Sequence, residues 1–277
     1  MVKSVIKIPS STPFRPLNCS HTQADKDMNR IAMIIGASGG LASAVARKLS
    51  DKGWQLALVT RDLNKLSQNP AATTSCLIEA DVSTAAGANE AISQCVTETG
   101  QTPTALINCA GSILMSPLHK TDENQYRQCM AANLDTSFFT LKAFIESCLK
   151  QKQPGVAVLI SSVTARIGVS NHEAVAASKA AVESLARSAA ATYSRNDIRV
   201  NAVAPGLMRS PATEWLFTTP NNTRQLDAQY PLGRHGQVED VAGTIAWLIS
   251  EDANWITGQV LPVDGGFTAV RPLQKAV

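Results

Sequence analysis

The sequence of 277 residues lacks the long apolar runs of a membrane protein and the basic clusters of a nucleic-acid-binding protein. No apolar stretch approaches the roughly 18 residues that a membrane-spanning helix needs. The net charge is only +3, and Lys and Arg are scattered along the chain instead of forming a stripe that could follow phosphates. We therefore expect neither a membrane nor a nucleic acid among the partners of this protein.

Cysteine and histidine are also too sparse and too scattered to form a metal site. The six cysteines show no CxxC spacing, and none of the four histidines lies at ligand spacing from a second His or Cys. Cys76 and Cys109 lie in apolar stretches, which is typical of free thiols that serve as small core residues. We predict no metal, a reducing compartment and a cytoplasmic location.

Residues 1–28 differ in composition from the rest, with basic and hydroxyl side chains and no acid before Asp25. This composition resembles that of an organellar transit peptide. A disordered leader, or an upstream start codon with Met28 as the true start, explains it as well, and these two together are favoured over targeting. We assign 1–28 to an N-terminal extension, disordered or targeting, and 29–277 to one domain.

From Arg30 onward, short apolar runs alternate with helical segments. The runs are too short and too continuously apolar for half-exposed strands, which predicts strands buried on both faces. Strand and helix in alternation predict an α/β fold, a doubly wound parallel sheet in a single domain. The expected strands are 31–35, 56–59, 76–80, 105–107, 156–160, 198–203 and 259–263, and the expected helices are 42–51, 85–97, 123–150, 174–194 and 238–249.

A glycine-rich turn joins the first predicted strand to the first helix, in the stretch IIGASGGLASAVARKL. At Gly36, Gly40 and Ala42, small side chains let the backbone approach a pyrophosphate at the helix N-terminus. Glycines in a tight turn need bind nothing, so the motif alone is weak. Its position between a strand and a helix, followed by a second strand that ends at Thr60, favours a dinucleotide site.

The residues after the second strand bear on the choice of cofactor. An acid there would hydrogen-bond the ribose 2'-hydroxyl of NAD, but Thr60 and Arg61 occupy these positions. An arginine can neutralise a 2'-phosphate, which favours NADP over NAD. Asp62 leaves an alternative, because it could simply pair with Arg61.

The chain from 30 to 268 resembles the short-chain dehydrogenase/reductases, most closely the 3-oxoacyl-carrier-protein reductase-like branch. The matching stretches, in order, are GASGGLA, ADV, NCAG, ANLDTSF, ISS, SKAAV, NAVAPGLMRS, PLGRHG and ITGQVLPVDGGF. Three positions depart mildly from the pattern, with Ala42 for a glycine, Cys109 for an asparagine and Ser210 for a threonine.

The resemblance implies a Rossmann fold that transfers a hydride between a nicotinamide cofactor and a carbonyl or alcohol substrate. It implies that Ser162 polarises the carbonyl, that Asn133 anchors a water and that Lys179 holds the nicotinamide ribose. The cofactor-binding residues implied by the turn and by the matching motifs are Gly36, Ser38, Gly40, Leu41, Arg61, Asp81, Val82, Asn108, Ala110, Gly111, Lys179, Pro205, Gly206 and Ser210.

One departure from the family pattern is not mild. The family's proton donor is a tyrosine four residues before the lysine, and this sequence has Val175 there. Tyr193 lies fourteen residues beyond Lys179 on the same predicted helix, roughly 21 Å away at 1.5 Å per residue, which is too far. Tyr126 occupies a position where the family carries a packing aromatic. Tyr230 falls in a segment expected to be mobile and is a remote candidate.

His172 is the better substitute for the missing tyrosine. It precedes Val175 by three residues, about one helical turn, where the family borders its substrate pocket. The alternative is structural, because Ser170 to Glu173 reads as a capping box that would make His172 an exposed first-turn residue. We hypothesise that His172 assists proton transfer or orients the substrate.

Two further stretches concern the substrate and the assembly. Trp215, Leu216 and Phe217 follow Ser210 where the family places a lid, and they either face an apolar part of the substrate or pack the lid onto its own domain. The resemblance implies a homotetramer or homodimer. A stripe of small side chains on the predicted helix 174–194 would permit close helix packing, within a subunit or across a two-fold axis; its members are Ala177, Ala181, Ser184 and Ser188.

These observations leave two principal hypotheses for the function. The first is an atypical NADP-dependent oxidoreductase acting on a small carbonyl or alcohol. The second is a catalytically silent NADP-binding regulatory or partner protein of the same fold, for which Val175 is the argument. A third hypothesis, non-redox chemistry with a structural cofactor, has less support.

Overall fold

A computed structural model describes residues 30–66 and 70–272 of the chain, so the expectations for 1–28 lie outside the described residues. A seven-stranded sheet with the strand order β3-β2-β1-β4-β5-β6-β9 forms the centre of the molecule. Every neighbouring pair of strands in it is parallel. The strands are β1 (Ile31–Ile35), β2 (Gln55–Thr60), β3 (Cys76–Glu79), β4 (Ala105–Asn108), β5 (Gly155–Ile160), β6 (Ile198–Pro205) and β9 (Val260–Val263).

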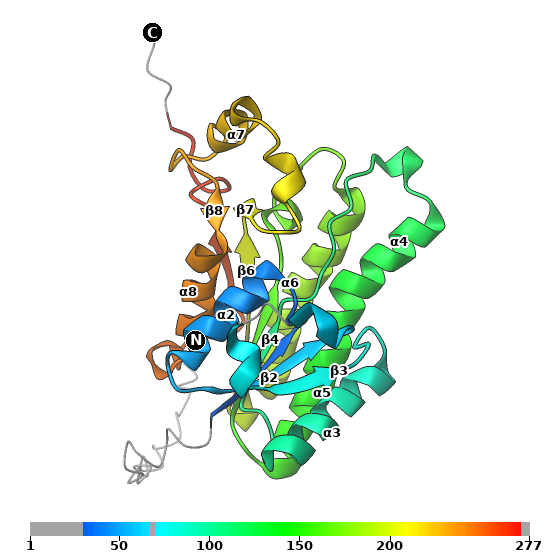
Figure 1. The fold of residues 1–277 in the computed structure, drawn as a ribbon, viewed down its shortest axis with the longest axis vertical. Helices are drawn as coiled ribbons and strands as arrows, with labels where there is room; N and C mark the ends of the chain where they lie inside the picture. Colours follow the sequence, from blue (N-terminus) through cyan, green and yellow to red (C-terminus); the bar gives the residue numbers. More distant parts are fainter. Residues whose placement is uncertain (1–29, 67–69, 273–277) are drawn as a thin grey trace, which may run out of the picture.

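Helices cover both faces of this sheet (Figure 1). One face carries α2 (Gly40–Ser50) and α8 (Val238–Leu248), and the other carries α3 (Ala85–Thr99), α5 (Thr136–Gln151) and α6 (Glu173–Tyr193). The doubly wound parallel sheet predicted from the sequence is thus confirmed. Most predicted elements agree with the observed bounds to within about two residues, the usual uncertainty at element ends.

The alternation of side chains along β1 separates two hydrophobic cores. Met33 points to the face where Leu141 of α5 and Val182 of α6 pack. Ile34 points to the opposite face and packs in the cluster that contains Val45 of α2. All five residues of β1 are buried because successive side chains of a central strand are covered by helices on alternate sides.

The prediction that every strand is buried on both faces was wrong for β3 and β9. In β3 only Ile78 is buried, and in β9 no residue is fully buried. These two strands form the edges of the sheet, where covering helices reach one side less completely. Short apolar runs in the sequence therefore did not distinguish edge strands from central ones.

The single helix predicted over 123–150 is divided in the structure. A π-helical turn, Ala131–Asp135, separates α4 (Glu123–Met130) from α5. Asn133 lies within this turn and is completely buried. Such turns insert an extra residue into a helix and are frequent at functional sites, and this one turns the Asn133 amide toward the loop after β4.

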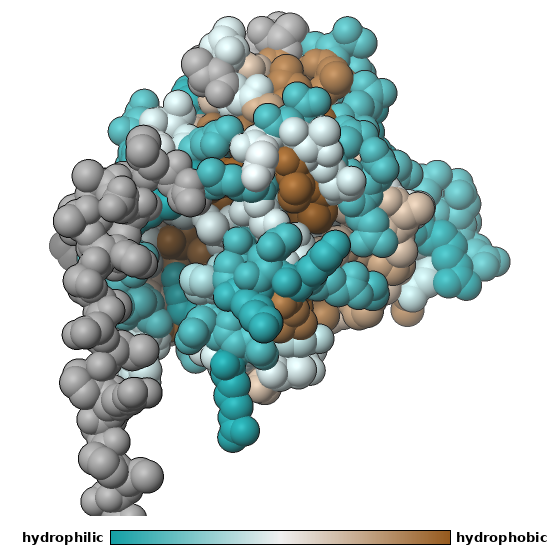
Figure 2. All heavy atoms as spheres, turned by 90° about the horizontal axis from the view of Figure 1, so that it is seen from below, coloured by the Kyte–Doolittle hydropathy of each residue, from teal (hydrophilic) through white to brown (hydrophobic). Residues whose placement is uncertain are grey.

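The end of the molecule opposite the upper helix α7 (Pro220–Asp227) carries a largely hydrophilic surface, interrupted by separate hydrophobic side chains (Figure 2). Across 30–66 and 70–272, no helix combines the length and the apolar composition needed to cross a bilayer. In open α/β sheets ligands bind outside the carboxyl ends of the strands, and the predicted site residues lie at that edge.

Candidate active site

The glycine-rich turn lies where the order of the strands reverses, between β1 and β4. Gly36 has a φ of +73°, and a methyl group built on it would lie 2.9 Å from Cα and N of Ala110 in the turn after β4. Ala110 is fixed there, because its N–H donates to Oδ1 of Asn108 at 2.9 Å. Only glycine permits this close approach of the two turns.

The N-terminus of α2 is free to receive an anion. Its N-cap residue, Gly39, supplies no side-chain hydrogen bond, and its first turn contains no acidic residue. The first N–H groups of the helix therefore keep their hydrogen-bonding capacity and the positive end of the helix dipole. Ser38 is exposed beside this turn, and Leu41 is half-buried. This cradle fits the pyrophosphate of a dinucleotide.

At the end of β2, Arg61 is exposed, and no hydrogen bond or ion pair holds it within the described part of the chain. Asp62 instead accepts from the N–H of Asn64 at 3.1 Å and lies 3.8 Å from the ammonium of Lys65. The structure therefore does not contain the pairing of Asp62 with Arg61 that the sequence left open. The Arg61 guanidinium is available for a ligand.

Asp81 and Val82, from the ADV motif, follow β3 on the same edge of the sheet. Hydrogen bonds from the Ser83 side chain and backbone lower the pKa of Asp81, and the charge of Arg61 adds to this effect. Val82 is buried in the core beneath it. Asp81 and Arg61 thus lie near one another beside the glycine-rich turn.

The amide of Asn133 is engaged on both its oxygen and its nitrogen by neighbouring groups of the chain. Its Oδ1 accepts from the N–H of Ser112 at 3.2 Å, and its Nδ2 donates to the carbonyl of Cys129 at 3.0 Å. These bonds fix the loop after β4 to the π-helical turn. A methyl group on Gly111 would lie 2.9 Å from Asn133 Oδ1 and 3.3 Å from Lys179 Nζ, so these two predicted site residues converge on that glycine.

Lys179 is buried on α6, and its Nζ donates to the carbonyl oxygen of Ile160 at 2.8 Å. Burial lowers the pKa of this ammonium to about 8. The neighbouring thiol of Cys109 supplies no negative charge at neutral pH, because burial raises its pKa to about 12. No carboxylate among the described residues pairs with Lys179.

Ser162 lies two residues after the end of β5 and is half-buried. Its Oγ accepts hydrogen bonds from the N–H of Thr164 at 3.2 Å and from the Thr164 hydroxyl at 3.0 Å. Two donors fix the oxygen, so the proton of the Ser162 hydroxyl is left for another acceptor. This orientation suits a group that donates to a carbonyl oxygen.

Val175 is buried one turn before Lys179 on α6, and its aliphatic side chain has no proton to donate. The capping box predicted for Ser170 to Glu173 was wrong. His172 is itself the N-cap residue, with no side-chain capping bond. The ring Nδ1 lies 2.8 Å from the carbonyl oxygen of Ser170. A carbonyl only accepts, so Nδ1 carries the hydrogen and Nε2 of a neutral ring carries none.

None of the three tyrosines of the chain replaces the missing phenol in an obvious way. Tyr230 is 8% exposed rather than part of a loose segment, and its Oη accepts from the N–H of Leu207 at 2.7 Å. Its ring stacks on Phe267 with centroids 5.0 Å apart. Tyr126 is 38% exposed beside Arg127, and Tyr193 ends α6.

The loop after β6 contains Pro205, Gly206 and Ser210 and reaches back to the glycine-rich turn. Pro205 is buried, while Gly206 and Ser210 are half-buried. A methyl group on Gly40 would lie 2.9 Å from Cδ of Pro211, the residue after Ser210. The structure therefore brings the turns after β1, β4 and β6, which are far apart in the sequence, together at one edge of the sheet.

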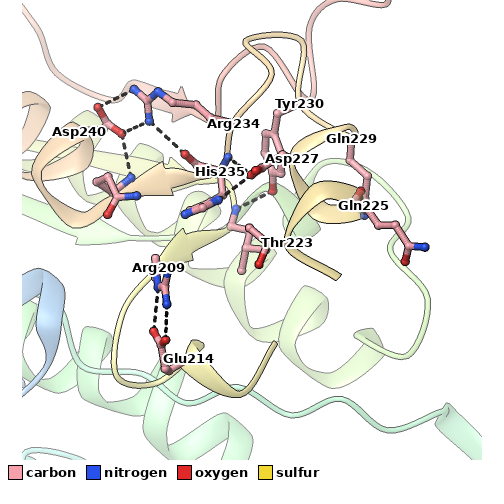
Figure 3. A network of polar contacts seen from close by, with 12 residues as sticks. Arg209, Glu214, Thr223, Gln225, Asp227, Gln229, Tyr230, Arg234, His235 and Asp240 are labelled. Carbon is pink, nitrogen blue, oxygen red and sulfur yellow. Dashed lines mark hydrogen bonds and ion pairs between the residues drawn. The ribbon is translucent and has the colours of Figure 1, made fainter. Parts of the chain in front are cut away.

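The segment from Ser210 to Tyr230 rises above this edge, and a polar network fastens it (Figure 3). It contains α7, and a short parallel pair of strands, β7 (Met208–Arg209) and β8 (Gly236–Gln237), lies at its base. His235 contacts two residues of the segment, Asp227 and Phe217. Its Nδ1 lies 2.6 Å from Oδ1 of Asp227, and its ring lies 4.6 Å from that of Phe217.

Of the two alternatives for the apolar residues of this segment, packing onto its own domain holds for Phe217. Phe217 is 8% exposed, and the Arg209 guanidinium lies over its ring at 5.3 Å from the centroid. Trp215 is 54% exposed, with Nε1 donating to the carbonyl of Ala212. The sequence did not indicate the role of His235 as the anchor, because no spacing links it to Asp227 or Phe217.

Comparisons with known proteins agree with this arrangement. The family model for Enoyl-(Acyl carrier protein) reductase matches residues 36–268. The chain is 32% identical over 251 residues to 2-(S)-hydroxypropyl-CoM dehydrogenase 3 of Xanthobacter autotrophicus, an alignment that covers 87% of this chain and 98% of the relative.

Solved structures give the same result. 4-Hydroxyisoleucine dehydrogenase complexed with NADH superposes with a TM-score of 0.80 at 26% identity, covering 88% of this chain and 100% of that one. ElxO with NADP bound gives a TM-score of 0.80 at 25% identity with the same coverage, as does a tyrosine-to-phenylalanine variant of ElxO with NADPH bound. With its sheet order, glycine cradle and matched length, this chain belongs to the short-chain dehydrogenase/reductase family, oxidoreductases that act on alcohols or carbonyls with NAD or NADP.

Proposed function

We propose that this protein is an NADP-dependent oxidoreductase of the 3-oxoacyl-carrier-protein reductase-like branch that moves its proton by an atypical route. The observation that carries the proposal is the convergence of Ser162, Lys179 and the Gly36 turn at one edge of the sheet. A bound nicotinamide would supply or accept the hydride. The protein binds both molecules, orients the substrate and transfers the proton.

The preference for NADP rests on Arg61. Its guanidinium is exposed beside the glycine-rich turn, and Asp62 is already engaged with Asn64 and Lys65. Arginine binds phosphate through several donors in one plane, which suits a ribose 2'-phosphate. The NADP bound to ElxO and the NADH bound to 4-hydroxyisoleucine dehydrogenase indicate that related proteins use either cofactor.

Ser162 orients the substrate in this proposal. Thr164 donates two hydrogen bonds to the Ser162 oxygen, so the Ser162 hydroxyl donates its own hydrogen bond to the carbonyl oxygen of a ketone or aldehyde. Asn133 acts indirectly, by holding the loop after β4 against the π-helical turn. The apolar part of the substrate would lie toward Ile113 and Met115, which are 45% and 44% exposed on that loop.

The proton must come from a group other than a tyrosine at position 175. Lys179 is a cation at neutral pH, and burial has brought its pKa down to about 8, close to the range in which a general acid works best. Ile160 accepts one of its three N–H bonds, which leaves two for the ribose and for a water or substrate oxygen. We assign the proton to Lys179, directly or through one water.

His172 has a second role in the proposal. Because its Nδ1–H is committed to Ser170, the neutral ring offers only an acceptor at Nε2. It would take up a proton when an alcohol is oxidised, or orient a substrate hydroxyl, and it could donate only as an imidazolium. A group that takes up the proton in oxidation returns it in reduction, so His172→Ala should lower kcat/KM by the same factor in both directions, and an unchanged kcat/KM would remove His172 from the scheme.

The second candidate is a catalytically silent NADP-binding protein, and Val175 is the observation that favours it. A general acid contributes roughly 10² to 10⁴ in rate, so its loss slows a reductase without necessarily abolishing turnover. The ElxO variant in which a phenylalanine replaces a tyrosine is described with NADPH bound. Cofactor binding and turnover therefore need separate measurements.

The deciding experiment measures binding and hydride transfer together. Deuterium transfer from labelled NADPH to any member of a carbonyl panel supports the enzyme, whereas binding by fluorescence without transfer supports the silent protein. Val175→Tyr should raise the reductase rate by about 10²-fold, and Val175→Phe, which adds the ring without the hydroxyl, should not. If neither NADPH nor NADH stabilises the protein in a melting experiment, both candidates fail.

We further propose that the protein assembles as a homotetramer or homodimer through α5 and α6. Three members of the stripe of small residues on α6, Ala177, Ser184 and Ser188, are exposed and the fourth, Ala181, is half-buried, which leaves most of the stripe accessible to another subunit. On α5 the ring of Phe138 is 47% exposed. Light scattering at micromolar concentration tests this, and a mass near 29.4 kDa would contradict it.

A further inference from the structure

A buried carboxylate lies one helical turn beyond Lys179, outside the set of residues to which the sequence assigned a role. Glu183 is on α6, and its side chain is 8% exposed. A charged group is costly to bury unless neighbouring charges and hydrogen bonds compensate it. The groups that compensate the buried charge of Glu183 therefore indicate its role.

Three side chains contact the Glu183 carboxylate. The Ser161 hydroxyl lies 3.1 Å from Oε1, Arg166 Nε donates to the same oxygen at 3.3 Å, and Arg187 lies 3.6 Å from Oε2. The side chains of Arg166 and Arg187 are partly exposed, at 34% and 51%. Among these two guanidinium groups and the carboxylate, only the carboxylate of Glu183 is buried.

The contact with Ser161 joins α6 to the end of β5. Ser161 Oγ also lies 3.2 Å from the carbonyl oxygen of Lys179, so its single proton is shared between two acceptors on α6. Ser161 itself is 3% exposed, and its N–H donates to Val203 of β6 at 2.7 Å. The residue that precedes Ser162 is thereby fixed on both sides.

Arg166 extends this connection to the edge of the sheet. While its Nε contacts Glu183, its second terminal nitrogen donates to the carbonyl oxygen of Val260 on β9 at 2.9 Å. Arg166 follows the short turn Val163–Ala165, and its two contacts join this turn to α6 and to β9. This turn begins with Ser162 as its N-cap, so the arginine holds the far side of the same turn.

We propose that Glu183 is a positioning residue that fixes the Ser162 hydroxyl relative to the Lys179 ammonium, an inference that rests on the proposed function. The two groups lie on different elements, the turn after β5 and helix α6. Four bonds cross between α6 and the segment at the end of β5: Lys179 Nζ donates to Ile160, Ser161 donates to the Lys179 carbonyl and to Glu183, and Arg166 donates to Glu183. Glu183 accepts two of these four bonds, so without its carboxylate the turn that carries Ser162 would keep only the bonds that involve Lys179.

Stability alone does not explain a carboxylate here. Replacing a buried ionic cluster by apolar side chains of similar volume is often neutral or stabilising in folded proteins. An apolar residue at 183 would pack in the same core as Val182 and Ala186 on α6. What such a residue cannot supply is an acceptor that orients the Ser161 hydroxyl, and a misplacement of reacting groups by about 1 Å can cost up to about 10²-fold in rate.

The test uses Glu183→Met, which keeps the length of the side chain and removes the acceptor, together with Glu183→Gln, which keeps an oxygen for Ser161. We expect kcat for carbonyl reduction to fall about tenfold in Glu183→Met, with partial recovery in Glu183→Gln and with little change in melting temperature. Glu146→Gln is the matched control, because Glu146 pairs with Lys142 on the exposed face of α5. It should change neither quantity.

A double-mutant cycle identifies the partner. Ser161→Ala should reduce kcat to a similar extent, and the double variant Ser161→Ala with Glu183→Met should fall no further than either single variant, because the bond between Ser161 and Glu183 is already lost in each of them. Additive losses, or an unchanged kcat in Glu183→Met, would overturn the proposal. A loss of kcat that follows a matching loss of melting temperature would overturn it as well.

Hydrogen exchange gives a readout that needs no turnover. The amides of residues 161–167 should exchange at least about tenfold faster in Glu183→Met, while those of α2 remain unchanged. If the wild-type protein binds NADPH but transfers no hydride, the proposed function fails, and this exchange experiment still decides the positioning role. Unchanged exchange at 161–167 would reject it in either case. If Glu183→Met does not fold, Arg166→Met removes one partner from a partly exposed site and is measured in the same way.

Discussion

The Nζ atom of Lys179 donates a hydrogen bond to the carbonyl oxygen of Ile160 at 2.8 Å. Ile160 is the last residue but one before Ser162, and Lys179 lies one turn beyond Val175 on α6. This one bond therefore sets the distance between the ammonium and the turn that follows β5. It also uses one of the three donors of Lys179, which leaves two for other acceptors.

The pH dependence of carbonyl reduction should reveal Lys179. Burial holds its pKa at about 8, below its ordinary value near 10.5, so the protonated form predominates only below about pH 8. We expect kcat/KM to fall as the pH rises through about 8. Lys179→Met should abolish this dependence and most of the activity, while Lys142→Met, at an exposed lysine of α5, should change neither. A wild-type profile that stays flat to pH 10 would remove Lys179 as the acid.

A pair of glycine variants separates backbone strain from the cofactor cradle. Gly36 and Gly100 have the same φ of +73°, but a methyl group on Gly100 meets nothing within 4 Å, whereas one on Gly36 lies 2.9 Å from Ala110. Gly100→Ala should cost about 1–2 kcal/mol of stability, from the left-handed backbone alone. Gly36→Ala should cost more and lose the stabilisation by NADPH. Thermal melting with and without NADPH checks this, and equal behaviour of the two variants would argue against a tight cradle.

Arg61→Ala should change the choice of cofactor. Loss of a charge-assisted contact to a 2'-phosphate removes about 1.5–3 kcal/mol, or roughly 10- to 100-fold in the Kd for NADPH. The Kd for NADH should stay nearly constant, because that cofactor lacks the phosphate. Arg47→Ala, at a surface arginine paired with Glu239, serves as the control. An equal loss for both cofactors would show that Arg61 acts on something other than the phosphate.

The contact between His235 and Asp227, which holds the segment from Ser210 to Tyr230, should affect the binding of the substrate and leave the binding of the cofactor unchanged. The hydrogen bonds from His235 lower the pKa of Asp227, so this carboxylate stays ionised at all pH values above its ordinary range. Asp227→Ala should free the end of α7 and raise KM for a carbonyl substrate several-fold, with the Kd for NADPH unchanged. Gln225→Ala, at an exposed position on the same helix, should behave as the wild type (Figure 3). A change in the Kd for NADPH without one in KM would place the anchor elsewhere.

The errors of the sequence interpretation each have their own physical cause. The apolar runs at 76–80 and 259–263 suggested central strands, yet β3 and β9 lie at the edges, because the order of the strands is set by the crossover connections and not by the apolar content of one run. The capping box expected before α6 failed because His172 takes the N-cap position itself. The π-helical turn at Asn133 was missed because the apolar pattern of 123–150 continues through it.

The sequence contains a pattern that indicates a buried position for Glu183. Val175, Lys179, Val182 and Ala186 recur at helical spacing, which places them on one face, and Glu183 falls on that same face four residues after Lys179. An acid on the apolar face of a helix is a candidate for a buried, paired carboxylate. The sequence could not name its partners, because Ser161 and Arg166 come from another element.

The sequence by itself determined the alternating strands and helices, the glycine-rich turn after the first strand, the positions of Ser162 and Lys179, and the valine at 175, because each depends on local periodicity or on the residue type at one position. Only the tertiary structure decided which side chains meet. Ile160 and Lys179, Ser161 and Glu183, and Asp227 and His235 are joined by bonds between elements, and hydrogen bonds depend on distances that no spacing along the chain encodes.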